Sequence, residues 1–136
     1  MSHPAGLPDR FLDRSLGRIQ VPGLLRAAGL HLVTLAEHYG VPADQEVKDV
    51  MWLKEAGRRG WVVLMKDRSI RSNVAERQAV KRYAIRCFCI PRQNLTAQEM
   101  TNRFLHNLSA MEAACAEPGP FIYAVDERRL RPLPLK

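Results

Sequence analysis

Short apolar runs alternate strictly with amphipathic segments along this chain. The run GWVVLM at 60–65 is apolar throughout, which is typical of a strand buried on both faces of a parallel sheet. The intervening segments are long enough to be crossover helices, which join parallel strands. We therefore predict an α/β fold with three layers, α/β/α, around a central, mainly parallel sheet of about five strands. The expected strands cover 10–13, 30–36, 60–65, 85–90 and 120–125, and the expected helices cover about 19–28, 44–57, 73–83 and a long segment after residue 96.

Two helix starts have recognisable capping residues. Thr96 and Glu99 form the pattern TAQE, a capping box that predicts a helix beginning just after Thr96. Asp44 precedes the apolar positions of the second helix, and we expect it to be the N-cap of that helix.

The 136 residues suffice for one domain with a sizeable core. Residues 1–9 contain two prolines and a glycine and are expected to form a flexible lead-in, with the domain at 10–126. Residues 127–136 read as a basic, proline-containing, mobile tail. The sequence shows no signal peptide and no membrane-spanning run, so we expect a cytoplasmic protein that does not associate with membranes.

Acidic residues follow the first three expected strands. Asp13, Glu37 and Asp67 come after strands one, two and three, and the helix before strand three can bring Asp49 to the same edge. Each acid alone could be a turn residue or a helix cap. Carboxylates that converge on the carboxyl edge of a parallel sheet repel one another unless they bind a hard cation. The pattern therefore favours a divalent-metal site and phosphodiester chemistry.

The net charge of +7 indicates a polyanionic or acidic partner. Basic residues lie next to the acidic edge in the sequence, where they could hold the phosphates of a nucleic acid. The candidates for this role are Arg14, Lys66, Arg68 and Arg71.

Other sites known on such sheets are absent from the sequence. There is no GxGxxG after the first strand, no GxxxxGK[ST] phosphate loop and no GxSxG nucleophile elbow. Cys87 and Cys89 alternate in IRCFCI and are expected to be buried core residues rather than metal ligands.

Three features of the sequence resemble the PIN-like toxin nucleases, in particular their VapC-related branch. These are Asp13 after the first strand, the block WLKEAGRRGWVVL between Asp49 and Asp67, and the basic helix that follows. The resemblance runs from about Arg10 to Ile90. It implies a metal-dependent endoribonuclease, the toxin of a bacterial type II toxin–antitoxin pair, in which Asp13, Asp49 and Asp67 hold Mg²⁺ or Mn²⁺. Glu37 corresponds to the acid after strand two.

The sequence departs from the family pattern after strand four. The family usually has a further acid there, whereas this chain reads IPRQN. The fourth ligand is therefore open between Glu37, Glu46 and Glu76. The resemblance also implies a cognate antitoxin protein as partner, an RNA substrate, and assembly as a homodimer or a toxin–antitoxin hetero-oligomer.

Two other functions remain open on the residues alone. The chain could be a non-catalytic, basic module that binds nucleic acid or a protein partner, with its acids serving only as caps. It could also be a metal-dependent nuclease for DNA ends or flaps, because RNA and DNA present the same phosphates.

Overall fold

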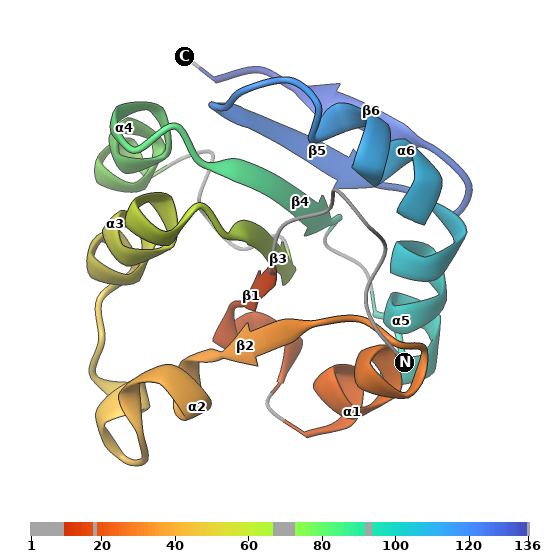
Figure 1. Ribbon diagram of the computed structural model, residues 1–136, viewed down its shortest axis with the longest axis horizontal. Helices are drawn as coiled ribbons and strands as arrows, with labels where there is room; N and C mark the ends of the chain where they lie inside the picture. Colours follow the sequence, from red (N-terminus) through yellow and green to blue (C-terminus); the bar gives the residue numbers. More distant parts are fainter. Residues whose placement is uncertain (1–9, 18, 67–72, 92–93, 136) are drawn as a thin grey trace.

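A computed structural model of the chain describes residues 10–17, 19–66, 73–91 and 94–135. The lead-in predicted at 1–9 lies outside these residues. Six strands form one sheet in the order β2-β1-β3-β4-β5-β6 (Figure 1). The strands are β1 (Arg10–Leu12), β2 (Leu32–Thr34), β3 (Val62–Lys66), β4 (Arg86–Ile90), β5 (Phe121–Val125) and β6 (Leu130–Leu133). Strands β1 to β5 pair in parallel, as predicted, and β6 pairs antiparallel with β5.

Helices cover both faces of the sheet. They are α1 (Gln20–Ala27), α2 (Leu35–Tyr39), α3 (Asp49–Arg59), α4 (Val74–Arg82), α5 (Ala97–His106) and α6 (Leu108–Ala114), with the 3-10 turns η1 (Arg14–Leu16) and η2 (Ala43–Gln45). Helices α3 and α4 pack on one face, and α1, α5 and α6 on the other (Figure 1). The predicted α/β/α architecture is confirmed.

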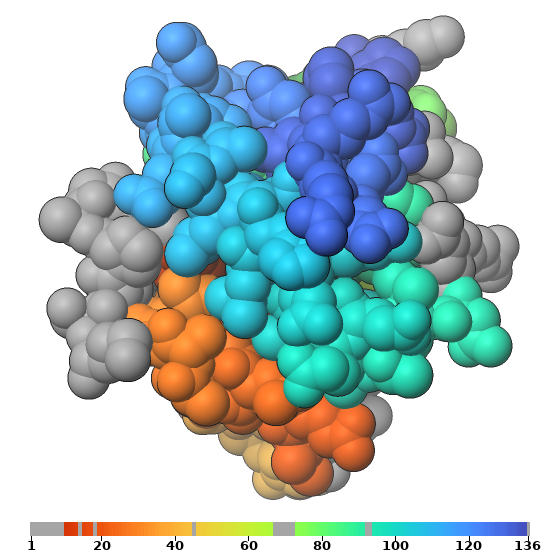
Figure 2. All heavy atoms as spheres, turned by 90° about the vertical axis from the view of Figure 1, so that its right-hand side faces the viewer, coloured from red at the N-terminus to blue at the C-terminus, as the bar shows by residue number. Residues whose placement is uncertain are grey.

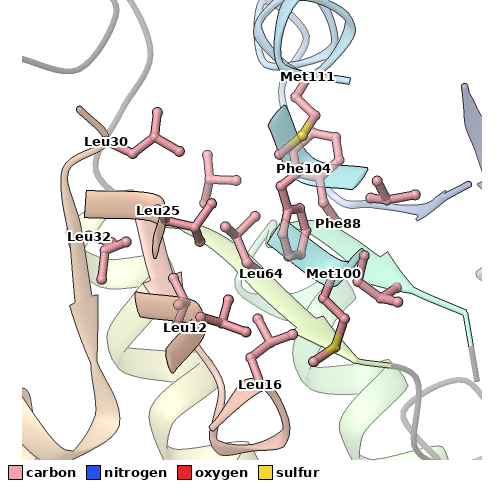
Figure 3. Packing of buried hydrophobic residues seen from close by; sticks show 14 residues of the cluster. Leu12, Leu16, Leu25, Leu30, Leu32, Leu64, Phe88, Met100, Phe104 and Met111 are labelled. Carbon is pink, nitrogen blue, oxygen red and sulfur yellow. The ribbon is translucent and has the colours of Figure 1, made fainter. Parts of the chain in front are cut away.

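Successive residues of the central strands point into two different cores. In β3, Val63 and Met65 join the core under α3 and α4, whereas Val62 and Leu64 join the core under α1, α5 and α6. Both faces of the strand are therefore buried, which explains its continuous apolar sequence. Figure 3 shows the second core, where Phe104 of α5 lies over Phe88 and Leu64 of the sheet. Figure 2 shows the outside of the same layer, with α1 and α5 in contact.

The structure corrects two boundaries near the second strand. The predicted strand at 30–36 is shorter, because Thr34 ends β2 and caps α2: its Oγ1 accepts from Glu37 N at 3.1 Å, and its N donates to Glu37 Oε1 at 3.0 Å. Asp44 is not an N-cap. It lies in η2, where its backbone N donates to Gly40 O at 2.8 Å, and α3 begins only after Lys48. The capping box of Thr96 and Glu99 is confirmed at the start of α5.

The prediction of a mobile tail at 127–136 is wrong for the part that forms β6. After a turn closed by Asp126 N donating to Arg129 O at 2.9 Å, Leu130–Leu133 runs back along β5, with Pro132 opposite Tyr123. Leu130 and Leu133 pack against the two cores. The sheet thus has six strands rather than about five. Among the described helices, none is both long and apolar enough to cross a membrane.

An ion-pair cluster joins α2 to the end of α3. Glu55 accepts from Arg58 Nε at 2.9 Å and from Arg59 Nε at 2.7 Å, and its Oε2 lies 2.9 Å from His38 Nε2. Hydrogen bonds from Arg58, then from Arg59, lower the pKa of Glu55 from 4.5 to about 2. A carboxylate with a lowered folded-state pKa stabilises the fold above its ordinary pKa, and that stabilisation is lost as pH falls through the folded-state value.

We expect Glu55→Gln to lower the free energy of unfolding by about 1 kcal/mol at pH 7, the upper range for solvent-accessible ion pairs. The difference from the unmodified chain should shrink as pH falls from about 4.5 towards 2. Urea unfolding at pH 7 and at several lower pH values measures it. Glu117→Gln, at an exposed position, is the control and should change stability little. If the difference in unfolding free energy between the two chains does not vary with pH, the charge of Glu55 is not what stabilises the fold.

Candidate metal centre

Asp13 continues β1 beyond its last residue and is fully buried (0% exposed). Its backbone N donates to Leu64 O at 3.0 Å, so it remains attached to β3. Its carboxylate Oδ2 accepts from Ser15 Oγ at 2.6 Å and from Ser15 N at 3.3 Å. Ser15 Oγ in turn accepts from Lys66 N at 3.0 Å. One serine therefore connects the Asp13 carboxylate to the last residue of β3.

The candidate substrate-binding residues are described only in part. Lys66 ends β3 and is half-buried beside Ser15. The metal-ligand candidate Asp67, together with Arg68 and Arg71, lies outside the described residues. Arg14 begins η1, but its side chain is also outside what the structure describes.

Asp49 is the first residue of α3, and the topology brings it to the carboxyl edge of the sheet. Helix α3 ends at Gly60, which leads into the amino end of β3, so the first turn of α3 lies at the opposite end of that strand. Asp49 Oδ1 accepts from Trp52 Nε1 at 2.8 Å. Trp52 is completely buried, so this contact fixes the carboxylate from inside the protein.

A pocket of about 600 Å³ opens between the first turns of α3 and α4. Asp49, Glu46 and Glu76 line it together, and Asn73 at its edge caps α4 by accepting from Glu76 N at 3.0 Å. Glu76 is only 8% exposed. The structure therefore places two of the acids considered as a fourth ligand beside Asp49.

Glu37 lies elsewhere and already has a structural role. Besides closing the capping box of α2, its Oε1 accepts from Arg26 Nη2 at 2.5 Å. The hydrogen bond from Arg26 lowers the pKa of Glu37 and raises that of Arg26. The described residues that line the pocket do not include Glu37.

The ligand atoms that these residues offer are of the type that a hard cation binds. Asp13, Asp49 and Glu76 offer carboxylate oxygens, which Mg²⁺ and Mn²⁺ prefer. Each aspartate is also oriented by a hydrogen-bond donor, from Ser15 or Trp52. Among the described residues, however, no three His, Cys, Asp or Glu side chains are grouped closely enough to hold one ion.

The hydrogen bond from Trp52 to Asp49 was missed in the sequence analysis. Residues three apart on a helix share a face, so the pair Asp49 and Trp52 could have been recognised from spacing. Cys87 and Cys89 are buried in β4, and both were correctly predicted as core.

Two comparisons with known proteins identify the family of this chain. The sequence matches the family described as "PIN like domain" over residues 8–92, a segment that contains Asp13, Asp49 and Asp67. It is also 42% identical over 126 residues to the Mycobacterium tuberculosis (strain ATCC 25618 / H37Rv) protein named "Putative ribonuclease VapC45", covering 93% of this chain and 91% of that protein. No solved structure matches the chain. The resemblance inferred from the motifs is confirmed: the chain belongs to the PIN-like domain family.

Proposed function

We propose that this protein is a metal-dependent endoribonuclease and the toxin of a bacterial type II toxin–antitoxin pair. The observation that carries the proposal is the placement of Asp13 and Asp49, each held by a hydrogen bond, at the carboxyl edge of the sheet in a PIN-like chain. The name of the M. tuberculosis relative supports ribonuclease activity rather than another hydrolysis.

Asp13, Asp49 and Asp67 would hold Mg²⁺ or Mn²⁺, with Glu76 as the fourth acid. Glu76 is preferred to Glu46 because it is more buried, and to Glu37 because it lines the same pocket as Asp49, whereas Glu37 does not. When bound, the cation supplies acidification of the attacking water and neutralisation of charge at the scissile phosphate.

In this proposal, side chains of the protein orient the metal ligands and bind the RNA. Ser15 holds the Asp13 carboxylate against the end of β3. Arg14, Lys66, Arg68 and Arg71 are proposed to bind the phosphates that flank the cleaved bond, since all four lie within four residues of Asp13 or Asp67 in the sequence. The net charge of +7 favours the approach of RNA.

An antitoxin is the proposed protein partner. Val50 and Met51 are exposed in the first turn of α3 and line the pocket that contains Asp49, and Val74 is exposed at the start of α4. Apolar side chains at the rim of a site form a surface that a protein can cover. A partner bound there would block access to the acids.

Replacing Asp67 with Asn tests the mechanism. We expect the unmodified chain to cleave structured RNA with Mg²⁺ or Mn²⁺ and not with EDTA, and the variant to cleave at least about 100-fold more slowly, because a metal ligand is lost. Gel analysis of end-labelled RNA measures both rates. Equal cleavage by the two chains would refute the mechanism. No cleavage by either, together with RNA binding that weakens in salt, would indicate the non-catalytic module.

A further inference from the structure

The indole of Trp52 makes a polar contact with the proposed metal ligand Asp49. Trp52 lies on α3, one turn after Asp49, and is 0% exposed. Its Nε1 donates a hydrogen bond to Asp49 Oδ1, with 2.8 Å between the nitrogen and the oxygen. An indole N–H can only donate, so this bond turns one oxygen of the carboxylate towards the interior.

The Trp52 ring is itself held by the aromatic packing of the core. Its centroid lies 5.4 Å from the ring of Phe11 at 33°, and Phe11 stacks on Trp61 at 5.2 Å and 5°. Phe11 is two residues before Asp13 on β1. The group that orients Asp49 is thus packed on Phe11 of β1, the strand that leads into Asp13.

We propose that Trp52 is a positioning residue that sets the orientation of the Asp49 carboxylate for the cation. The inference rests on the proposed function, because it assumes that Asp49 is a metal ligand. Donors that fix the orientation of a ligating side chain strengthen metal binding, and their loss typically lowers the affinity 10- to 100-fold. A buried tryptophan that merely satisfies its own N–H would have no such effect on metal affinity.

Trp52→Phe keeps an aromatic ring in the core and removes the N–H. We expect it to weaken Mn²⁺ binding about tenfold, measured as a shift to higher concentration in the Mn²⁺-dependent rise of the melting temperature. Trp61→Phe is the matched control, since Trp61 belongs to the same ring layer, and it should shift the midpoint less than about twofold.

The possible outcomes of these measurements separate the role of Trp52 from the existence of the metal centre. Unchanged Mn²⁺ affinity in Trp52→Phe, or an equal loss of affinity in Trp61→Phe, overturns the role of Trp52 while leaving the metal centre intact. No stabilisation of the unmodified chain by Mn²⁺ refutes the metal centre itself, and the role of Trp52 with it.

A second measurement does not require a stable Trp52 variant. In Trp61→Phe, Trp52 is the sole tryptophan, so its fluorescence reports on the Asp49 contact. We expect Mn²⁺ to change this emission with the same midpoint as the melting-temperature shift. If Mn²⁺ stabilises the protein but leaves the emission of Trp52 unchanged, the inference is wrong.

Discussion

Asp13→Asn is expected to lower the rate of metal-dependent RNA cleavage at least about a thousandfold, which corresponds to about 4 kcal/mol of transition-state stabilisation. The change should spare the fold. Ser15 Oγ and Ser15 N both donate to Oδ2 of Asp13, and the amide oxygen of asparagine can accept these bonds in its place. What is lost is the negative charge of the carboxylate and one of the two oxygen atoms that could bind the metal ion. The stabilisation by Mn²⁺ should disappear with the activity.

Single-turnover cleavage and the melting temperature with and without Mn²⁺ test this expectation. Asp126→Asn is the matched control, because Asp126 also follows a strand of the sheet but its carboxylate binds Arg131 at 3.1 and 3.3 Å. The control should cleave at nearly the unmodified rate. Cleavage by Asp13→Asn within tenfold of the unmodified chain would remove Asp13 from the proposed metal ligands.

Phe88→Ala is expected to lower the free energy of unfolding by about 4 kcal/mol. Phe88 is 0% exposed in β4, which has a partner strand on each side. Its ring stacks on Tyr123 at 5.9 Å and 15° and meets Phe121 edge-on at 5.6 Å, while Phe104 of α5 belongs to the same core (Figure 3). Removing such a ring loses burial and leaves a cavity that the sheet cannot close.

Urea unfolding followed by circular dichroism measures the loss. Phe88→Leu retains most of the buried volume and should cost less than half as much. If the two variants destabilise the protein equally, the aromatic contacts rather than the cavity would account for the effect. If neither destabilises it by more than about 1 kcal/mol, β4 is not a central strand of the core.

The architecture could be predicted because most strands are buried on both faces. The run 60–65 is apolar throughout and 85–90 is apolar apart from Arg86, which is typical of strands at the centre of a parallel sheet. The last strand was missed for the opposite reason. Leu130–Leu133 reads LRPL, with a proline and an arginine, and only its pairing with β5 makes it a strand. Tertiary pairing of this kind leaves little signal in the local sequence.

The acidic residues of the candidate site could be identified from the sequence, but their individual contacts could not. Asp13 and Asp49 were placed at the carboxyl edge by the order of strands and helices alone. The sequence carries no comparable information about side-chain contacts. Glu37 binds Arg26, eleven residues earlier in the chain, because Arg26 also lies against β2, where its Nη2 donates to Leu32 O at 3.0 Å. The pocket that joins Asp49 to Glu76 likewise depends on the packing of α3 against α4.

The proline in β6 has a consequence for how this protein meets other chains. Asp126 N donates to Arg129 O, which sets the alternation of the antiparallel ladder. The backbone N–H and C=O groups of Arg131 and Leu133 therefore face β5, and the backbone groups of Leu130 and Pro132 face away from it. Pro132 therefore costs the sheet no internal hydrogen bond, but it removes a donor from the exposed edge. A foreign strand could not pair regularly along β6, which disfavours edge-to-edge aggregation at this edge of the sheet.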